Sequence, residues 1–186
     1  MRKLKLQMNI TIDGFVGGEN GELDWMLQET DTKHIEYLNS ITENTDMILL
    51  GRNMAQISIP HWQKASENTS ENSETDFAKF FTETLKVVFS KTLKNIEGKN
   101  TVLENGNLKH AVEQLKTQSG LDIMVYGGAQ FVSSLISENL IDELNLFVHP
   151  VSLGKGLPIF KSESKYKLAK AAFYSNGIVL HKYVKS

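Results

Sequence analysis

The chain contains three short, continuous apolar runs that each end in a polar or glycine turn, and this repeated pattern constrains the fold most. The runs cover residues 47–50, 87–89 and 123–126. The turns that follow them are Gly51-Arg52-Asn53, Ser90-Lys91-Thr92 and Gly127-Gly128. Apolar runs of this length are typical of strands covered on both faces of a sheet. Because segments with helical spacing separate the runs, the sequence predicts an α/β fold whose sheet is mostly parallel.

Helical spacing connects these predicted strands, and a further strand precedes them at 4–12. In residues 31–44 the apolar side chains Ile35, Leu38 and Ile41 recur at helical spacing, with Asp31 or Thr32 as N-cap. Similar spacing predicts helices around residues 77–85, 108–115 and 131–136. The stretch 64–75 is rich in Ser, Glu, Asn and Thr and is predicted as a solvated loop.

The carboxyl-terminal part of the chain has a different texture. Leu144, Leu146 and Val148 alternate with other residues, which is typical of a strand. Asn176-Gly177 lies between two strand-like runs and predicts a hairpin, because both turn positions tolerate positive φ. With 186 residues, the chain suffices for one core, so we expect a single domain over residues 1–186.

Composition excludes several classes of function. The formal net charge is −2 with mixed signs along the chain, so no basic stripe is available for a nucleic acid. The absence of cysteine excludes disulfides and thiolate metal sites and favours a reducing compartment, the cytoplasm. No apolar run approaches the roughly 20 residues of a membrane span. The five histidines show no metal-ligand spacing, so we expect no metal site.

The turns after the three apolar runs carry the functional prediction. In open α/β sheets, ligands bind outside the carboxyl ends of the strands. Gly127-Gly128 would let a phosphate approach the backbone, and the helix that follows would offer unpaired N–H groups. Arg52, Ser90 and Lys91 would add cationic and hydroxyl donors.

Each of these residues also has a plainer interpretation. Gly127-Gly128 is equally well explained by a tight turn, and Arg52 and Lys91 by solvated surface positions. Only the convergence of the three turns favours a phosphate site. The G-x-G-x-x-G fingerprint of Rossmann dehydrogenases is absent, which disfavours that class.

The chain resembles the dihydrofolate reductase superfamily, in the branch of the riboflavin-pathway pyrimidine reductases, the bacterial RibD C-terminal domain. The resemblance covers nearly the whole chain through short motifs in a fixed order. They are Thr11-Ile12-Asp13-Gly14-Phe15, Gly21-Glu22-Leu23-Asp24-Trp25, Leu50-Gly51-Arg52, Val88-Phe89-Ser90, Val125-Tyr126-Gly127-Gly128-Ala129, Leu140-Ile141-Asp142-Glu143-Leu144 and the segment His149-Pro150-Val151-Ser152-Leu153-Gly154-Lys155-Gly156.

The resemblance implies a three-layer dihydrofolate-reductase-like fold: a mostly parallel sheet with an antiparallel carboxyl-terminal strand and helices on both faces. It also implies NADPH as cofactor. Residues implied around the pyrophosphate are Gly127, Gly128, Ala129, Gln130 and Phe131, and Tyr126 is implied as a further cofactor-binding residue. Those implied near the adenosine side are Gly51, Arg52, Ser90 and Lys91. The loop 13–25 would cover the nicotinamide, with Gly14, Leu23 and Trp25 as cofactor-binding residues.

The activity that the resemblance implies is NADPH-dependent reduction of a small heterocyclic or ribosyl-pyrimidine substrate in riboflavin biosynthesis. It is most like that of 5-amino-6-(5-phosphoribosylamino)uracil reductase or of a dihydrofolate-reductase-like enzyme. Asp13 is the candidate acid or orienting group, although its interpretation as a turn-forming aspartate is at least as good. Trp25 would line the nicotinamide pocket or, equally well, be a core aromatic.

Two further predictions concern the missing acid and the assembly. No residue matches the acid of the first long helix in dihydrofolate reductases, so the alternative is a non-catalytic NADPH-binding or sensor protein. The carboxyl-terminal strands carry Phe147, Phe160, Phe173 and Tyr174, which suggests an apolar surface and a homodimer.

Overall fold

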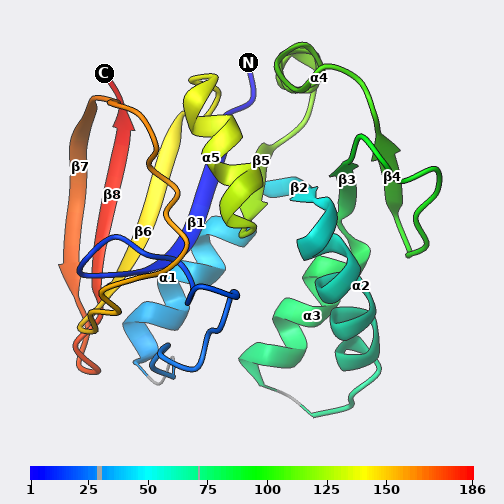
Figure 1. Cartoon of the computed structure of the whole chain (residues 1–186). Coiled ribbons are helices and arrows are strands. Elements are labelled where there is room, and N and C mark those ends of the chain that lie inside the picture. The colour runs from blue at the N-terminus through cyan, green and yellow to red at the C-terminus, as the bar shows by residue number, and fades with distance from the viewer. Residues whose placement is uncertain (29–30, 71) are drawn as a thin grey trace.

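The computed structural model describes residues 1–28, 31–70 and 72–186. Eight strands form one sheet in the order β4-β3-β2-β5-β1-β6-β8-β7 (Figure 1). The strands are β1 (Leu4–Thr11), β2 (Thr45–Gly51), β3 (Leu85–Phe89), β4 (Thr101–Glu104), β5 (Asp122–Tyr126), β6 (Glu143–His149), β7 (Tyr166–Phe173) and β8 (Val179–Lys185). The first six strands in chain order pair in parallel, whereas β8 is antiparallel to both β6 and β7. This confirms the predicted mixed sheet.

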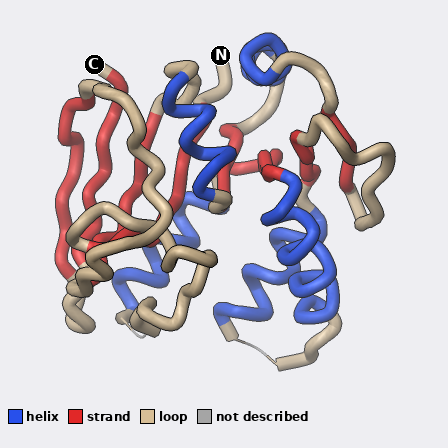
Figure 2. Tube along the Cα trace, viewed as in Figure 1, coloured by secondary structure: helices blue, strands red, loops and turns tan. Residues whose placement is uncertain are grey.

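The helices form two layers around the sheet (Figure 2). They are α1 (Thr32–Thr42), α2 (Arg52–Ser66), α3 (Ser73–Glu83), α4 (Leu108–Thr117) and α5 (Ala129–Ser137). Helices α4 and α5 pack on one face, where they bury the even-numbered side chains of β1. Helices α2 and α3 cover the opposite face over β2 and β3, and α1 covers it over β6 and β8. No helix in the described residues is long and apolar enough to cross a membrane.

The split between α1 and the α2–α3 pair determines which residues of β1 remain accessible. Side chains alternate between the two faces of a strand. Because Leu4, Leu6, Met8 and Ile10 of β1 face α4 and α5, the odd-numbered positions project to the face that α1, α2 and α3 share. Strands β1 and β5 lie at the centre of this face, between the two groups of helices.

Helix α2 and strand β4 were not predicted. Residues 64–66, predicted as part of a loop, are the last turn of α2. This helix begins directly after β2 with Gly51 as its N-cap and contains Pro60, so the usual sequence markers of a helix start are missing. Strand β4 has only four residues and lies at the edge of the sheet, where no strong pattern is required.

The predicted hairpin between β7 and β8 exists, but its turn differs from the prediction. Only Gly177 has positive φ (+85°), while Asn176 does not. The N–H of Gly177 donates to the carbonyl of Tyr174 at 3.0 Å, which closes a type I turn before the left-handed glycine. The Asn176 side chain instead accepts from the N–H of Ile178 at 3.3 Å. This hydrogen bond gives asparagine a role in the turn although its φ is not positive.

Two aromatic residues of the predicted dimer surface lie in the core. Phe147 is fully buried and Tyr174 is 6% exposed. Both rings stack on His34 of α1 with centroid distances of 4.5 Å. They therefore hold α1 on the sheet, and of the four predicted residues only Phe160 and Phe173 are accessible at the surface.

Candidate functional site

A cleft of about 1610 Å³ runs along the carboxyl ends of the central strands and into the space between α1 and α3. We divide it into two halves. The glycine half consists of residues 51–53, 90–92 and 127–131, at the ends of β2, β3 and β5. The aromatic half has β1 as its floor and α1, α2 and α3 as its walls. Its residues are Gln7, Asn9, Ile35, Leu38, Met54, Trp62, Phe77, Phe80 and Tyr126.

The glycine half brings together the strand ends that the sequence suggested. The Arg52 guanidinium, after β2, donates to the hydroxyl of Thr92, after β3, at 2.9 Å. The Ser90 hydroxyl accepts from the backbone N–H groups of Thr92 (3.2 Å) and Leu93 (3.0 Å), which fixes the turn after β3. Lys91 donates from Nζ to the carbonyl of Asn105 at 2.9 Å. The two cations are therefore held at neighbouring strand ends and remain exposed.

Two helices begin in the glycine half, and both lack a side-chain cap. The N-caps of α2 and α5 are Gly51 and Gly128, and among the described residues no N–H group at either helix start donates to a capping side chain. In contrast, the N-caps of α1, α3 and α4 are Asp31, Asn72 and Asn107, whose side chains accept from the first N–H groups. The unpaired N–H groups of α2 and α5, together with the helix dipoles, make this half suited to anions.

Glycine is required at different positions of this half for different structural reasons. A Cβ on Gly51 would lie 2.7 Å from the Cβ of Phe131, so Gly51 is required for α5 to approach β2. Gly127 and Gly128 have φ of +67° and +80°, which other residues rarely adopt. A Cβ on Gly128 would lie 3.7 Å from the Cβ atoms of Met54 and Phe131, which is ordinary van der Waals contact, and Gly128 itself lines the cleft. Gly128 thus combines an unusual backbone conformation with a position in the lining of the cleft.

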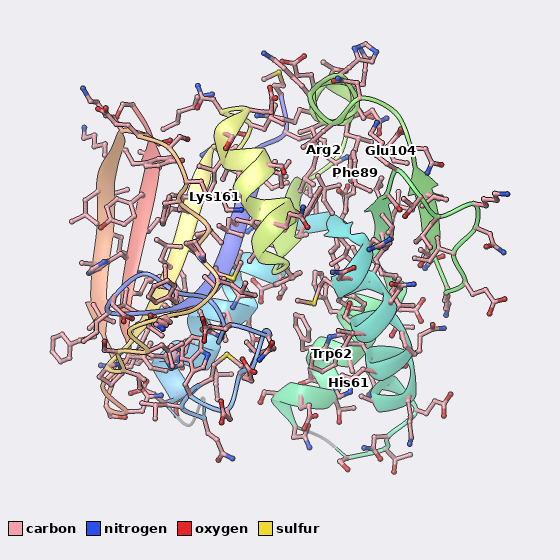
Figure 3. The ribbon with its side chains drawn as sticks, in the orientation of Figure 1. Arg2, His61, Trp62, Phe89, Glu104 and Lys161 are labelled. Atoms are coloured by element: carbon pink, nitrogen blue, oxygen red, sulfur yellow. The ribbon has the colours of Figure 1, made fainter. Side chains whose placement is uncertain are left out.

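Aromatic side chains form one wall of the aromatic half. Trp62 of α2 (Figure 3) meets Phe77 of α3 edge-on with 4.8 Å between ring centroids. Phe77 in turn meets the ring of Tyr126, at the end of β5, at 5.4 Å. Burial raises the pKa of the Tyr126 phenol, so this side chain stays neutral. The wall offers flat apolar surface for stacking.

The two halves of the cleft also differ in the charge of the side chains that line them. Its lining cations are Arg52 and Lys91 in the glycine half and Lys161 in the segment between β6 and β7, which Figure 3 labels near α5. The ionised side chains that α3 and the residue after α1 contribute are all carboxylates, namely Glu43, Glu74 and Asp76. Among the described lining residues, α1, α3 and the part of α2 after Arg52 therefore provide no cation.

Asp13 lies outside the lining that the described residues form. Its carboxylate accepts from the Thr11 hydroxyl (2.5 Å), the Ser152 hydroxyl (2.7 Å) and the N–H groups of Leu153 (3.3 Å) and Gly154 (2.7 Å). The bond from Thr11 contributes most to holding the pKa of Asp13 well below its usual range. The residue ties the turn after β1 to the segment after β6, as a turn-forming aspartate does.

Of the three cofactor-binding residues predicted in the loop 13–25, Leu23 lines the cleft as the structure describes it, whereas Gly14 and Trp25 do not. Other residues of the same loop also line it, namely Val16, Gly17, Asn20 and Gly21. Gly14 forms a turn with φ of +88° and donates to the carbonyl of Thr11 at 3.0 Å. Trp25 is 8% exposed and packs edge-on against His149 at 5.3 Å. Trp25 therefore has the surroundings of a core aromatic.

The floor of the aromatic half was missed in the sequence, although a signal was present. In residues 4–10, apolar side chains alternate with Lys5, Gln7 and Asn9. For the central strand of a sheet with helices on both faces, polar residues at alternate positions are unusual. They indicate that one face of β1 is not fully covered, which is the position of the cleft.

Comparisons with known proteins agree with this architecture. The family model of the RibD C-terminal domain matches residues 2–180. YyaP of Bacillus subtilis (strain 168), itself uncharacterised, is 35% identical over 182 residues that cover 96% of this chain and 92% of YyaP. The riboflavin biosynthesis protein RibD of Corynebacterium ammoniagenes is 23% identical over 158 residues, which cover 80% of this chain and 43% of RibD.

A solved structure shares the fold at low sequence identity. It is a diaminohydroxyphosphoribosylaminopyrimidine deaminase/5-amino-6-(5-phosphoribosylamino)uracil reductase from Thermotoga maritima. With 15% identity it superimposes at a TM-score of 0.68 and covers 100% of this chain and 57% of the Thermotoga chain. The predicted resemblance in fold is thereby confirmed, and the match over residues 2–180 shows that this chain belongs to the RibD C-terminal domain family.

Proposed function

We propose that the chain is an NADPH-dependent reductase of a small flat-ring substrate. The observation that carries this proposal is the glycine half, where two helix starts without side-chain caps face the same cleft as Arg52 and Lys91. Unpaired N–H groups bind a pyrophosphate, and a guanidinium with an ammonium binds an additional phosphate monoester. This combination fits NADPH better than NADH, because only NADPH carries the third phosphate.

The order of the strands gives the cofactor a direction. Adenosine would lie at the ends of β3 and β2, near Ser90, Lys91 and Arg52, and the pyrophosphate at Gly127 and Gly128 after β5. The nicotinamide would then reach β1. Adjacent strands are about 4.8 Å apart, so β3 and β1 are separated by about 14 Å across the sheet. An extended dinucleotide has this order of length.

When bound, NADPH supplies a hydride from its nicotinamide ring. The work of the protein is to position a substrate ring in the aromatic half, beside the nicotinamide end of the cleft. Trp62, Phe77 and Tyr126 would stack with or border that ring. Because Asp13 lies outside the cleft and its carboxylate stays ionised, we propose that water supplies the proton.

A second candidate is a non-catalytic NADPH-binding or sensor protein. The placement of Asp13 outside the lining favours it, since a cofactor site persists when the acid is missing. Both candidates share the glycine half and differ only in turnover. Either would act in the cytoplasm, a reducing compartment that suits a chain without cysteine.

Titration of the protein with NADPH and with NADH, followed by nicotinamide fluorescence, tests the shared proposal. We expect NADPH to bind at least tenfold more tightly than NADH. Absence of binding at millimolar NADPH would refute both candidates. Oxidation of NADPH with pteridines, aminopyrimidine ribosides or simple carbonyls then separates them, because the sensor predicts no turnover with any substrate.

We also propose a homodimer that forms through the exposed side chains of the carboxyl-terminal strands. Phe173 is 85% exposed and Leu168 is 52% exposed, both on β7 at the edge of the sheet. Exposed apolar side chains on an unpaired edge strand favour self-association. Light scattering measures the mass directly, and a monomer mass at every concentration would contradict this proposal.

A further inference from the structure

The side chain of Asn9 on the floor of the aromatic half is buried without a complete set of partners. Its Oδ1 atom is inaccessible and accepts no hydrogen bond from the described residues. Its Nδ2 atom has a single contact, with the sulfur of Met26 at 3.4 Å, and a thioether is a weak acceptor. Leaving a buried polar atom unpaired is unfavourable, so such an atom needs an explanation.

Asn145 provides an internal comparison, because it lies on the neighbouring strand and faces the same helices. The Tyr37 hydroxyl donates to its Oδ1 at 2.7 Å, and its Nδ2 donates to the carbonyl of Leu6 at 3.2 Å. The fold therefore gives both polar atoms of the Asn145 amide a partner. Asn9 differs in that it lines the cleft. Because Oδ1 is inaccessible in the position described, the Asn9 amide has to turn toward the cleft for a ligand there to supply the partner that the chain lacks.

The surroundings of Asn9 define the chemistry of that ligand. The amide of asparagine offers one acceptor and one donor side by side, which matches a ring edge with adjacent N–H and C=O groups. The wall of Trp62, Phe77 and Tyr126 suits the faces of a flat ring. Gln7 lies two residues before Asn9 on the same face of β1 and also lines the cleft.

The charges of the same half argue against a phosphate group on this ligand. Phosphates are bound in proteins by arginine, lysine or helix N-termini. The lining cations Arg52 and Lys91 belong to the glycine half, which NADPH would occupy. The third, Lys161, lies in the segment between β6 and β7 near α5 (Figure 3) and not on α1, α2 or α3. The walls of the aromatic half contribute Glu43, Glu74 and Asp76, which would repel a phosphate.

We propose that the aromatic half binds a flat, phosphate-free heterocycle whose N–H and C=O edge pairs with the side-chain amide of Asn9. This inference rests on the proposed function for the identity of the site as a substrate pocket. It separates the chain from the Thermotoga relative, whose name includes a phosphoribosyl substrate. Ring type and stacking would be shared with such a compound, whereas its phosphate would meet the carboxylates of Glu43, Glu74 and Asp76 at the helix walls.

The experiment compares one ring with and without its phosphate. 5-Amino-6-(5-phosphoribosylamino)uracil and the same compound after phosphatase treatment are titrated calorimetrically into the protein. Each titration is carried out with and without saturating NADP⁺, which binds without supplying a hydride. We expect the phosphate-free compound to bind at least tenfold more tightly. Equal affinity, a preference for the phosphate, or no binding of either compound at millimolar concentration would overturn the inference.

Variants show whether Asn9 carries the recognition. Asn9→Leu keeps the size of the side chain but removes its hydrogen bonds. We expect this variant to bind the phosphate-free compound at least tenfold more weakly than the wild-type protein does. Its affinity for NADPH should be unchanged. Asn95→Leu makes the same chemical change at an exposed position in the loop between β3 and β4 and serves as control. Thermal melting checks that Asn9→Leu folds; if it does not, Asn9→Asp, which keeps acceptors but loses the N–H donors, replaces it.

The outcomes also separate this inference from the proposed function. If the wild-type protein does not bind NADPH, the proposed reductase function is refuted. The titration of the uracil compounds without NADP⁺ still tests the proposed ligand of the aromatic half. If NADPH binds and Asn9→Leu leaves the affinity for the uracil compound unchanged, the role of Asn9 is refuted and the reductase stands.

Discussion

The two halves of the cleft are built by different means. The glycine half is made mainly by the backbone: the starts of α2 and α5 and the positive φ of Gly127 and Gly128. The aromatic half is made by side chains from α1, α2, α3 and two strands, which only the complete fold brings together. A backbone site tolerates many side chains and serves a ligand common to a family. A side-chain site changes with each substitution and is suited to setting the substrate.

The largest effect that this comparison predicts is at Gly128. Asp and Asn both tolerate positive φ and have nearly the same size, so they differ mainly in charge. Gly128→Asp would place a carboxylate at the proposed pyrophosphate site. We expect its affinity for NADPH to fall more than 100-fold, which corresponds to about 2.7 kcal/mol. Fluorescence titration measures this loss.

Gly128→Asn is the matched control for Gly128→Asp, because it adds a side chain of nearly the same size without the negative charge. We expect it to bind NADPH within about tenfold of the wild-type protein, because it preserves the backbone conformation and adds no charge. Both variants should retain the affinity of the aromatic half for a phosphate-free ring. Equal affinities of the Asp and Asn variants for NADPH would show that no phosphate lies at Gly128.

The same contrast explains what could be predicted from the sequence. The strand ends at Gly51-Arg52, Ser90-Lys91 and Gly127-Gly128 are contiguous in sequence, and the general rule for open sheets places them together. Their convergence needed no knowledge of side-chain packing. The Asn176-Gly177 hairpin was likewise a local signal, although its turn type depended on a hydrogen bond of the Asn176 side chain.

The aromatic half could not be predicted in this way. Trp62 lies in α2, a helix without the expected start signals, and its contact with Phe77 depends on how two helices pack. Asp13 belongs to a recognisable motif, but only the fold shows its carboxylate bonded to Ser152 and Gly154, far along the chain. Motifs locate such residues, whereas tertiary contacts decide their roles.

The second prediction concerns the acid sensitivity of the aromatic half, whose wall α1 is held through His34. This ring is fully buried between Phe147 and Tyr174, and neither ring nitrogen has a hydrogen-bond partner among the described residues. Burial lowers the pKa of His34 from 6.5 to about 4. The unfolded chain therefore takes up the proton first, and the free energy of unfolding falls as the pH decreases from 6.5 to about 4.

His34→Phe should remove this sensitivity, because a phenyl ring fills the same stack without titrating. We expect the variant to lose about 2 kcal/mol less unfolding free energy than the wild-type protein over that pH range. Urea unfolding at pH 7 and pH 4.5 measures the difference. His61→Phe on the exposed surface of α2 is the control. The same pH dependence in His34→Phe as in the wild-type protein would show that another group controls the docking of α1.

A smaller effect is expected at Arg52, which tests how specifically the glycine half selects its cofactor. Arg52→Gln retains hydrogen-bond donors but removes the charge. We expect the preference for NADPH over NADH to fall about tenfold, since a charge-assisted bond to the 2′-phosphate contributes about 1.4 kcal/mol. Titration of both cofactors at two salt concentrations gives this ratio and its screening. Arg52→Lys should retain most of the preference; an unchanged ratio in Arg52→Gln would assign the discrimination to Lys91 alone.

The smallest effect is expected at Asp13, and it decides whether the loop 13–25 takes part in chemistry at all. If Asp13 were the acid, Asp13→Asn would abolish turnover or move the acidic limb of its pH profile. Because hydrogen bonds hold the pKa of Asp13 well below its usual range, the carboxylate carries no proton to donate at neutral pH. We therefore expect an unchanged pH profile and a lower melting temperature, since the amide cannot accept every bond from Thr11, Ser152, Leu153 and Gly154. Steady-state rates between pH 5 and 9, with a melting curve for each protein, separate the catalytic role from the structural one. A fall in turnover without a fall in stability would show that Asp13 takes part in the reaction. The active site would then extend beyond both halves of the cleft.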